Sequence, residues 1–219
     1  MIVHHLASEN SIIHKFINEL RDQSIQKDAQ RFRRNIERIG EILAYEISKT
    51  LDFSAKSLET PLATYHGKSI ADAIVICSVL RAGLPLHNGL LNYFDDAENT
   101  FISAFRHQTN TENDFEIVVE YLASPSLEGK TLILADPMLA TGQSMVAVLK
   151  ALKAMGKPKK IHIASVIGAT EGVEFIKKHF PEDTTLWIAA IDENLNEKGY
   201  IVPGLGDAGD LAFGSKLQH

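Results

Sequence analysis

Cysteine and tryptophan are nearly missing from this chain, which has one of each in 219 residues. A single thiol has no partner for an internal disulfide, so the class of small disulfide-stabilised folds is excluded. Cys77 lies inside the apolar segment "AIVICSVL", which predicts a buried and unreactive thiol. The nine histidines are scattered, with no HExxH or CxxC pattern beside them, so we expect no structural zinc site.

An excess of positive charge and long apolar runs are also missing. Lysine and arginine together number 22 against 28 aspartates and glutamates, giving a net charge of -6, which argues against a nucleic-acid partner. No apolar run approaches the roughly 20 residues that cross a bilayer, which argues against a membrane partner. The opening "MIVHHLASEN" does not show the charged start and apolar stretch of a signal peptide. We therefore expect a cytoplasmic protein.

The composition is that of an ordinary globular protein, with 45% hydrophobic and 23% charged residues. A chain of 219 residues fits a single domain, and we see no internal repeat or low-complexity segment. The apolar content is sufficient to cover both faces of a sheet.

The hydrophobic pattern changes from helical to strand-like along the chain. Apolar residues recur with helical spacing over 12–20 and 32–47, and Arg31, Arg33 and Arg34 on the second helix are expected to face solvent. Strands are then expected at 73–79, 100–106, 115–122, 131–135, 161–168 and 185–191, with helices at 80–91, 144–155 and 171–180. This alternation predicts an α/β fold, a doubly wound, mostly parallel sheet flanked by helices.

The segment "TLILADPMLATGQS" (131–144) runs from a buried strand into a helix. Ligands collect at this end of the strands in such sheets. Backbone N–H groups from Met138 to Gly142, with a helix beginning near Thr141, predict a phosphate cradle. No lysine follows the glycine and there is no GxGxxG pattern, so the segment is neither a Walker loop nor a dinucleotide loop.

Asp136 precedes this cradle. Its carboxylate repels phosphate but accepts hydrogen bonds from two neighbouring hydroxyls, and a ribose 5-phosphate carries both groups on one molecule. The alternative interpretation is an Asp-Pro turn followed by a threonine helix cap, with no ligand.

The segment that contains Asp136 resembles a motif of a known family. "LILADPMLATGQS" resembles the phosphoribosyl-pyrophosphate motif of type I phosphoribosyltransferases, and the Asp-Pro-Met-Leu form resembles the uracil phosphoribosyltransferase family. The resemblance covers most of residues 30–216. The further matching segments are "RFRRNIERIGEILAYEIS" (31–48), "ETPLA" (59–63), "VLRAGLPL" (79–86), "FR" (105–106) and "GYIVPGLGDAGDLAFGSK" (199–216).

The resemblance implies the fold of type I phosphoribosyltransferases in a single domain, 1–219. It implies N-terminal helices over 1–51, a core sheet over 70–190 with a mobile arm at about 106–122, and a base-binding hood over 191–219. The implied reaction transfers ribose 5-phosphate from phosphoribosyl pyrophosphate to uracil N1, giving UMP and diphosphate. Mg2+ is the implied cofactor, held through diphosphate and water rather than directly by the protein. The implied partners are these two substrates, further copies of the chain in a homodimer or larger oligomer, and GTP as an effector.

The resemblance also implies roles for single residues. Asp136, Asp207 and Arg106 correspond to catalytic positions. The residues implied for phosphoribosyl pyrophosphate are Arg81, Arg106, Asp136, Pro137, Met138, Leu139, Ala140, Thr141, Gly142, Gln143, Ser144 and Asp207. Those implied for uracil are Ile201, Gly206, Asp207 and Ala208, with Tyr200 nearby.

Three positions depart from the family pattern. Gln143 stands where the phosphate loop has a second glycine, Ala123 falls about where the arm has a lysine, and Leu211 replaces a basic residue after Gly-Asp. Three other functions stay open: transfer to another base, an RNA-binding regulator on the same fold, or a nucleotide sensor without turnover. Gln143 and the altered arm favour the sensor.

Overall fold

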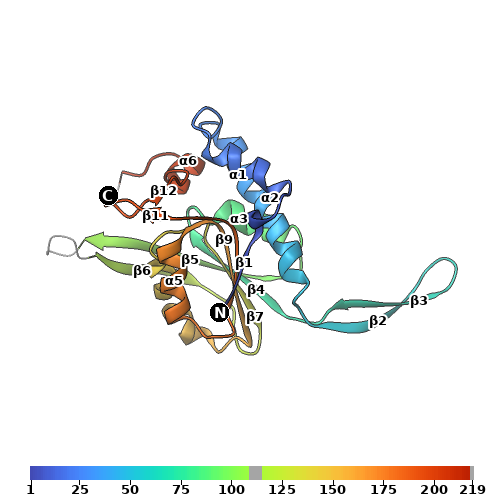
Figure 1. Ribbon diagram of the computed structural model, residues 1–219. Coiled ribbons are helices and arrows are strands. Elements are labelled where there is room, and N and C mark those ends of the chain that lie inside the picture. Colours follow the sequence, from blue (N-terminus) through green and yellow to red (C-terminus); the bar gives the residue numbers. More distant parts are fainter. Residues whose placement is uncertain (109–114, 218–219) are drawn as a thin grey trace.

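The computed structural model of this chain describes residues 1–108 and 115–217. A central sheet has the strand order β1-β10-β9-β7-β4-β5-β6, with β8 beside β9 (Figure 1). The strands are β1 (Ile2–His5), β4 (Ile74–Leu80), β5 (Glu98–Gln108), β6 (Phe115–Ala123), β7 (Thr131–Ala135), β8 (Met138–Leu139), β9 (Lys160–Ala169) and β10 (Thr185–Asp192). All neighbours run parallel except β5 and β6, so the prediction of a mostly parallel sheet is confirmed.

Helices cover both faces of this sheet. They are α1 (Ile13–Arg21), α2 (Ala29–Ser48), α3 (Leu84–Leu91), α4 (Gln143–Leu152), α5 (Thr170–His179) and α6 (Ala208–Phe213), with short 3-10 turns η1 (Leu6–Ser8) and η2 (Lys153–Met155). Alternate strand residues point to opposite faces, so Ile74 and Ile76 pack with the first three helices while Val75 and Cys77 pack with α4 and α5. Two-sided burial explains why the central strands are continuously apolar.

Cys77 is fully buried, as predicted. Burial raises the pKa of its thiol to about 12, so the thiolate is absent at neutral pH. No helix among the described residues is both long and apolar enough to cross a membrane.

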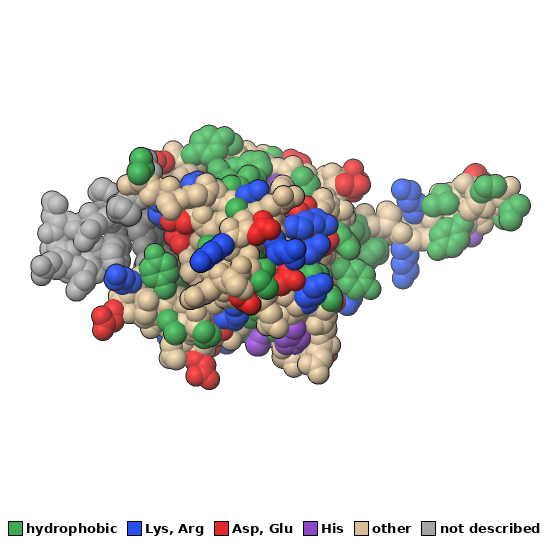
Figure 2. Space-filling view, turned by 90° about the horizontal axis from the view of Figure 1, so that it is seen from above, with side chains coloured by type: hydrophobic (Ala, Val, Ile, Leu, Met, Phe, Trp, Pro, Cys, Tyr) green, Lys and Arg blue, Asp and Glu red, His purple; other side chains and the backbone are tan. Residues whose placement is uncertain are grey.

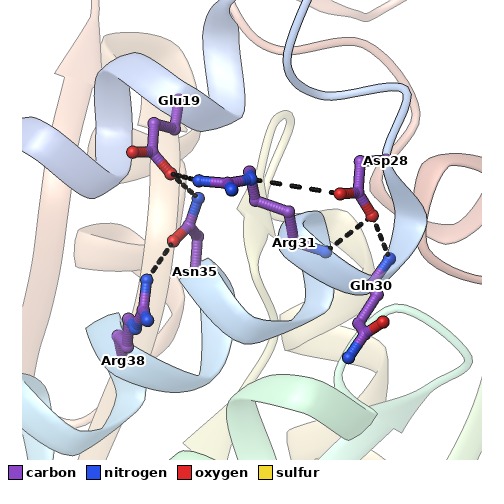
Figure 3. Close-up of polar contacts among 6 residues, drawn as sticks. All are labelled: Glu19, Asp28, Gln30, Arg31, Asn35 and Arg38. Carbon is purple, nitrogen blue, oxygen red and sulfur yellow. Dashed lines mark hydrogen bonds and ion pairs between the residues drawn. The ribbon is translucent and has the colours of Figure 1, made fainter.

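The exposed face of α2 carries a network of charges (Figure 3). Asp28 caps the helix by accepting from the backbone N–H groups of Gln30 and Arg31. Arg31 also pairs with Glu19 of α1 at 3.5 Å, so this arginine lies at the surface as predicted. Arg34 pairs with two glutamates of its own helix and is likewise half-exposed. The prediction was wrong for Arg33, whose guanidinium donates to the Ala212 carbonyl at 2.6 Å.

Three features were not predicted. Strand β1 joins the sheet edge beside β10. Strands β2 (Phe53–Glu59) and β3 (Thr64–Ile70) form an antiparallel hairpin that projects from the body (Figures 1 and 2). Within the predicted hood, two short strands, β11 (Asn194–Leu195) and β12 (Ile201–Val202), pair ahead of α6.

Candidate active site

A cleft of about 1140 Å³ opens at the carboxyl ends of the parallel strands. Its walls come from the end of β4, the segment between β7 and α4, and the hood (residues 191–217), so regions far apart in sequence share one cavity. The predicted residues that line it are Arg81, Asp136, Met138, Leu139, Ala140, Thr141, Gly142, Ser144, Ile201, Gly206, Asp207 and Ala208.

Two predicted residues do not line this cleft. Pro137 is buried, and its carbonyl accepts from the N–H groups of Val166 and Ile167 in β9. Gln143 opens instead on a smaller neighbouring pocket of about 410 Å³, where Lys198 also lies.

Asp136 is fixed at the mouth of β7 by the adjacent strand. Its backbone N–H donates to the Ala164 carbonyl at 3.2 Å, and its carbonyl accepts from the Ser165 hydroxyl at 2.7 Å. Its Oδ1 atom accepts from the Met138 N–H at 3.1 Å. Burial raises the pKa of the carboxyl from 3.8 to about 6, although this hydrogen bond favours the ionised form. The group is therefore mostly ionised at neutral pH and becomes protonated below about pH 6.

The segment predicted to bind phosphate is shifted two residues along the chain. Met138 and Leu139 form β8, which pairs with β9, and the Met138 N–H is donated to Asp136. Helix α4 begins at Gln143 rather than near Thr141. The cradle therefore runs from Ala140 to Ser144, where N–H groups of the first helical turn have no intrahelical partner.

Gly142 makes this cradle possible. Its φ is 78°, a left-handed conformation that side chains rarely adopt, and a Cβ there would lie 3.0 Å from the Gly172 carbonyl of α5. The close approach of the two helices therefore requires glycine at this position.

Arg81 lies on the turn between β4 and α3. Its Nη2 atom donates to Asp210 Oδ1 and to the Gly214 carbonyl, each at 3.1 Å. The turn is tight, because a Cβ at Gly83 would lie 2.5 Å from the Val79 carbonyl. The arginine and the hood are thus in direct contact across the cleft.

In the hood, Asp207 caps the N-terminus of α6 by accepting from the Asp210 N–H at 3.0 Å. Its other carboxylate oxygen lies 3.4 Å from Lys216 Nζ. Gly206 has a φ of 94°, while Ile201 and Ala208 are buried at the cleft wall. Gly206 and Ala208 add little side-chain bulk to this part of the cleft wall.

Two cleft cations were not predicted. Lys198 and Lys216 line the cavity together with Arg81. Their position within "NEKGYIVPG" and at the end of "GDLAFGSK" was the available signal, but lysines at a loop surface are common and no local pattern separates these two.

Arg106 lies in β5, where its backbone is in register with Ile117 of β6. Its side chain and residues 109–114 lie outside the described part of the chain. Within the predicted arm at 106–122, Glu120 of β6 lines the cleft, as do Ser103 and Ala104 of β5 just before it.

The family model described as uracil phosphoribosyltransferase matches residues 7–215. A uracil phosphoribosyltransferase from Porphyromonas gingivalis is 52% identical over 99% of this chain and 100% of its own length. One from Thermococcus gammatolerans is 40% identical over 96% of this chain and 92% of its own length.

The chain belongs to the uracil phosphoribosyltransferase family. It is an enzyme that transfers a phosphoribosyl group to uracil, as the resemblance implied. A solved structure from Aquifex aeolicus has a TM-score of 0.87 with 29% identity, covering 99% of this chain and 100% of its own. A hypoxanthine phosphoribosyltransferase from Staphylococcus aureus, at 16% identity and a TM-score of 0.51 over 85% of this chain and 83% of its own, shares the fold alone.

Proposed function

We propose that the cleft binds phosphoribosyl pyrophosphate along its floor and uracil beneath the hood. The 5-phosphate occupies the cradle from Ala140 to Ser144, the ribose hydroxyls face Asp136, and the diphosphate extends toward Arg81. The observation that supports this order best is the shared cavity, which places the cradle, Asp136, Arg81 and the hood around one space. The products are UMP and diphosphate.

Asp136 suits the sugar better than the phosphate. Its Oδ1 atom already accepts from Met138, and Oδ2 has no hydrogen-bond partner among the described residues, so an acceptor remains for a ribose hydroxyl. The ionised form binds hydroxyls as an acceptor only. The carboxylate also places negative charge near the ribose, where positive charge develops as the bond from C1 to the departing oxygen breaks.

The hood suits a neutral pyrimidine. Uracil presents O2, N3–H and O4 as acceptor, donor and acceptor, and main-chain groups near Ile201 and from Gly206 to Ala208 can match this pattern without charge. A main-chain N–H that faces O4 rejects cytosine, because the cytosine amino group is also a donor and both would be left unpaired.

Arg81, Lys198 and Lys216 supply the positive charge for a strongly anionic substrate. A guanidinium pairs with two phosphate oxygens at once, which suits Arg81 to the diphosphate. Arg106 is assigned to the same group by the family motif alone. Catalysis here consists mainly of alignment and stabilisation of charge, rather than covalent chemistry by the protein.

The cleft fits Mg2+ that is held mainly by the substrate. This ion prefers oxygen ligands and commonly uses one or two carboxylates with substrate phosphates. Among the described residues no group of three or more His, Cys, Asp or Glu side chains can hold a metal, whereas Asp207 and Asp136 both line the cavity. Asp207 would hold the ion through water, and Mg2+ when bound neutralises charge on the diphosphate.

We also propose that the chain acts as a homo-oligomer. The β2–β3 hairpin exposes apolar side chains along an isolated two-stranded ribbon, including Leu58, Leu62 and Tyr65 at 43%, 97% and 57% exposure (Figure 2). Such a ribbon is at best marginally stable alone in water, so a second copy that covers it would stabilise it. A single domain over 1–219 and an effector site for GTP remain predictions from the family resemblance.

The assignment is tested by incubating the purified protein with phosphoribosyl pyrophosphate, Mg2+ and one nucleobase at a time. We expect UMP with uracil, and rates at least 100-fold lower with cytosine and with purines. Binding of phosphoribosyl pyrophosphate without product from any base would contradict it and favour a sensor.

A further inference from the structure

Gly204 lies at the centre of the hood turn. It separates Ile201 from Gly206, the two sides of the proposed uracil subsite. Its φ is 62°, and a Cβ there would lie 2.0 Å from the Ile201 carbonyl, so the main chain folds back on itself at this residue. The position of Gly204 therefore sets the spacing between the two sides.

Both main-chain hydrogen-bonding groups of Gly204 are held by one ion pair. Its N–H donates to Asp192 Oδ2 at 2.8 Å, and its carbonyl accepts from Arg21 Nη1 at 3.0 Å. Arg21 donates in turn to both carboxylate oxygens of Asp192, at 2.8 Å and 2.7 Å. Asp192 ends β10 and Arg21 ends α1, so the turn is fastened to the central sheet and to the N-terminal helix together.

The pair is shielded and charged. The side chains of Asp192 and Arg21 are 8% and 23% exposed. Burial alone would raise the pKa of the Asp192 carboxyl, but the hydrogen bonds from Arg21 and from the Gly204 N–H outweigh burial and lower this pKa. The carboxylate is therefore ionised at neutral pH, and its hydrogen bonds are of the stronger, charge-assisted kind.

Two more N-terminal side chains hold the same region. Gln26 Nε2 donates to the Leu205 carbonyl at 3.1 Å, and Arg33 donates to the Ala212 carbonyl. These contacts tie the hood to residues before 34 in the chain, none of which lines the cleft.

We infer that Arg21 and Asp192 are positioning residues for base recognition, which hold the Gly204 turn where main-chain groups can read uracil. This inference rests on the proposed location of uracil beneath the hood. Main-chain recognition depends on placement within a few tenths of an ångström, since the backbone cannot select a new rotamer. A looser turn weakens binding of the base and its discrimination from cytosine, while the phosphate cradle on the α4 side is untouched.

The test uses Arg21→Lys and Asp192→Asn with steady-state kinetics on both substrates. A lysine ammonium cannot hold two carboxylate oxygens and the Gly204 carbonyl in the planar arrangement of a guanidinium. We expect the KM for uracil to rise about tenfold in each variant, as for loss of one charge-assisted hydrogen bond. The KM for phosphoribosyl pyrophosphate should stay within about twofold, and the ratio of kcat/KM for uracil over cytosine should fall about tenfold.

Arg31→Lys is the matched control. Arg31 also joins α1 and α2, through Glu19 and Asp28 (Figure 3), and within the described part of the chain it makes no hydrogen bond or ion pair with the hood. It should change neither KM. Thermal melting of every variant separates a general loss of folding from a change in the turn.

Two results would overturn the inference. One is an unchanged KM for uracil in both variants. The other is a parallel rise of both KM values with a lower melting temperature, which indicates a structural role only. The variant Ala208→Leu, which fills the proposed base subsite, shows whether the positioning role is wrong or the location of uracil is wrong. If Ala208→Leu also leaves the KM for uracil unchanged, the location of the base is wrong; if it alone raises that KM, only the positioning role is wrong.

Discussion

Arg81 Nη2 and Asp210 Oδ1 lie 3.1 Å apart, although 129 positions separate the two residues. The contact joins the turn after β4 to helix α6, and it occupies the guanidinium that we assign to diphosphate. Both side chains are about one-third to one-half exposed, so the pair contributes at most about 1 kcal/mol and is easily exchanged for a phosphate group. Substrate binding would thus release one hood contact and replace it with a stronger one.

Substitution of Arg81 tests that exchange. We expect Arg81→Gln to raise the KM for phosphoribosyl pyrophosphate by about 10- to 100-fold, because a charge-assisted hydrogen bond to phosphate is lost. Asp210→Asn should leave this KM unchanged or lower it by up to about threefold, since it frees the guanidinium without removing it. Initial rates at saturating uracil, with phosphoribosyl pyrophosphate varied, measure this KM in both variants. Equal effects of the two substitutions would contradict the assignment and indicate that the contact itself is what matters.

Asp136→Asn should lower activity and raise stability at the same time. We expect kcat to fall about 100- to 1000-fold, because the sugar loses its anionic acceptor. At pH 7 the ligand-free variant should be more stable by at most about 3 kcal/mol, because burial raises the pKa of the wild-type carboxyl to about 6 and its ionised form is costly. Urea unfolding at pH 7 and at pH 4 measures this difference, which should shrink at the lower pH. A variant that is less stable at pH 7 would contradict the cost of burial.

The same carboxyl predicts the acid side of the pH profile. Because the Asp136 pKa is about 6, kcat/KM for phosphoribosyl pyrophosphate should fall toward tenfold per pH unit below that value. Above pH 7 it should be independent of this group. In the Asp136→Asn variant the residual activity should lack this limb, and an unchanged limb would assign it to another residue.

Substitution of Gln143 should have a small effect and substitution of Gly142 a large one, although the two residues are adjacent. Gln143 is the first residue of α4 and faces the smaller pocket, so Gln143→Gly should cost at most about 1 kcal/mol of stability and change the KM for phosphoribosyl pyrophosphate less than twofold. Gly142→Ala should raise this KM at least about tenfold, because the left-handed φ and the nearby Gly172 carbonyl force the cradle to shift. Kinetics and thermal melting measure both, and a faster Gln143→Gly enzyme would show that the glutamine hinders phosphate binding.

The proposed role of the β2–β3 hairpin in oligomer formation can be tested by introducing charged side chains. Leu58 and Tyr65 are direct cross-strand partners, and the double substitution Leu58→Lys and Tyr65→Lys should disrupt packing by a second copy. We expect a shift toward monomer in sedimentation or light scattering. The control is His66→Lys. His66 lies on the opposite face of β3 and forms a hydrogen bond with Ser57, so this substitution should not change the oligomeric state. A wild-type chain that is monomeric at micromolar concentration would contradict the oligomer proposal.

Much of the core was determined by local sequence. The run from Thr131 to Ala135 is apolar throughout because helices cover both sides of β7, and Gly142 follows because the turn into α4 requires a positive φ. These constraints act within a few residues, so the strand and the turn that follows Asp136 could be predicted together. The hairpin was missed since its strands are exposed on both faces and carry no buried periodicity.

The sequence by itself thus determined the parallel sheet, the glycine turn into α4 and the acidic residue before it, because each follows from hydrophobic periodicity or from the backbone conformation of a turn. Only the tertiary structure decided where the hood lies. Its contacts with the rest of the molecule include the pair of Arg21 and Asp192, 171 positions apart, which holds Gly204, and the hydrogen bond from Arg33 to the Ala212 carbonyl. Pairing of this kind satisfies buried charges and main-chain groups in three dimensions, and it leaves no spacing in the chain from which it can be read.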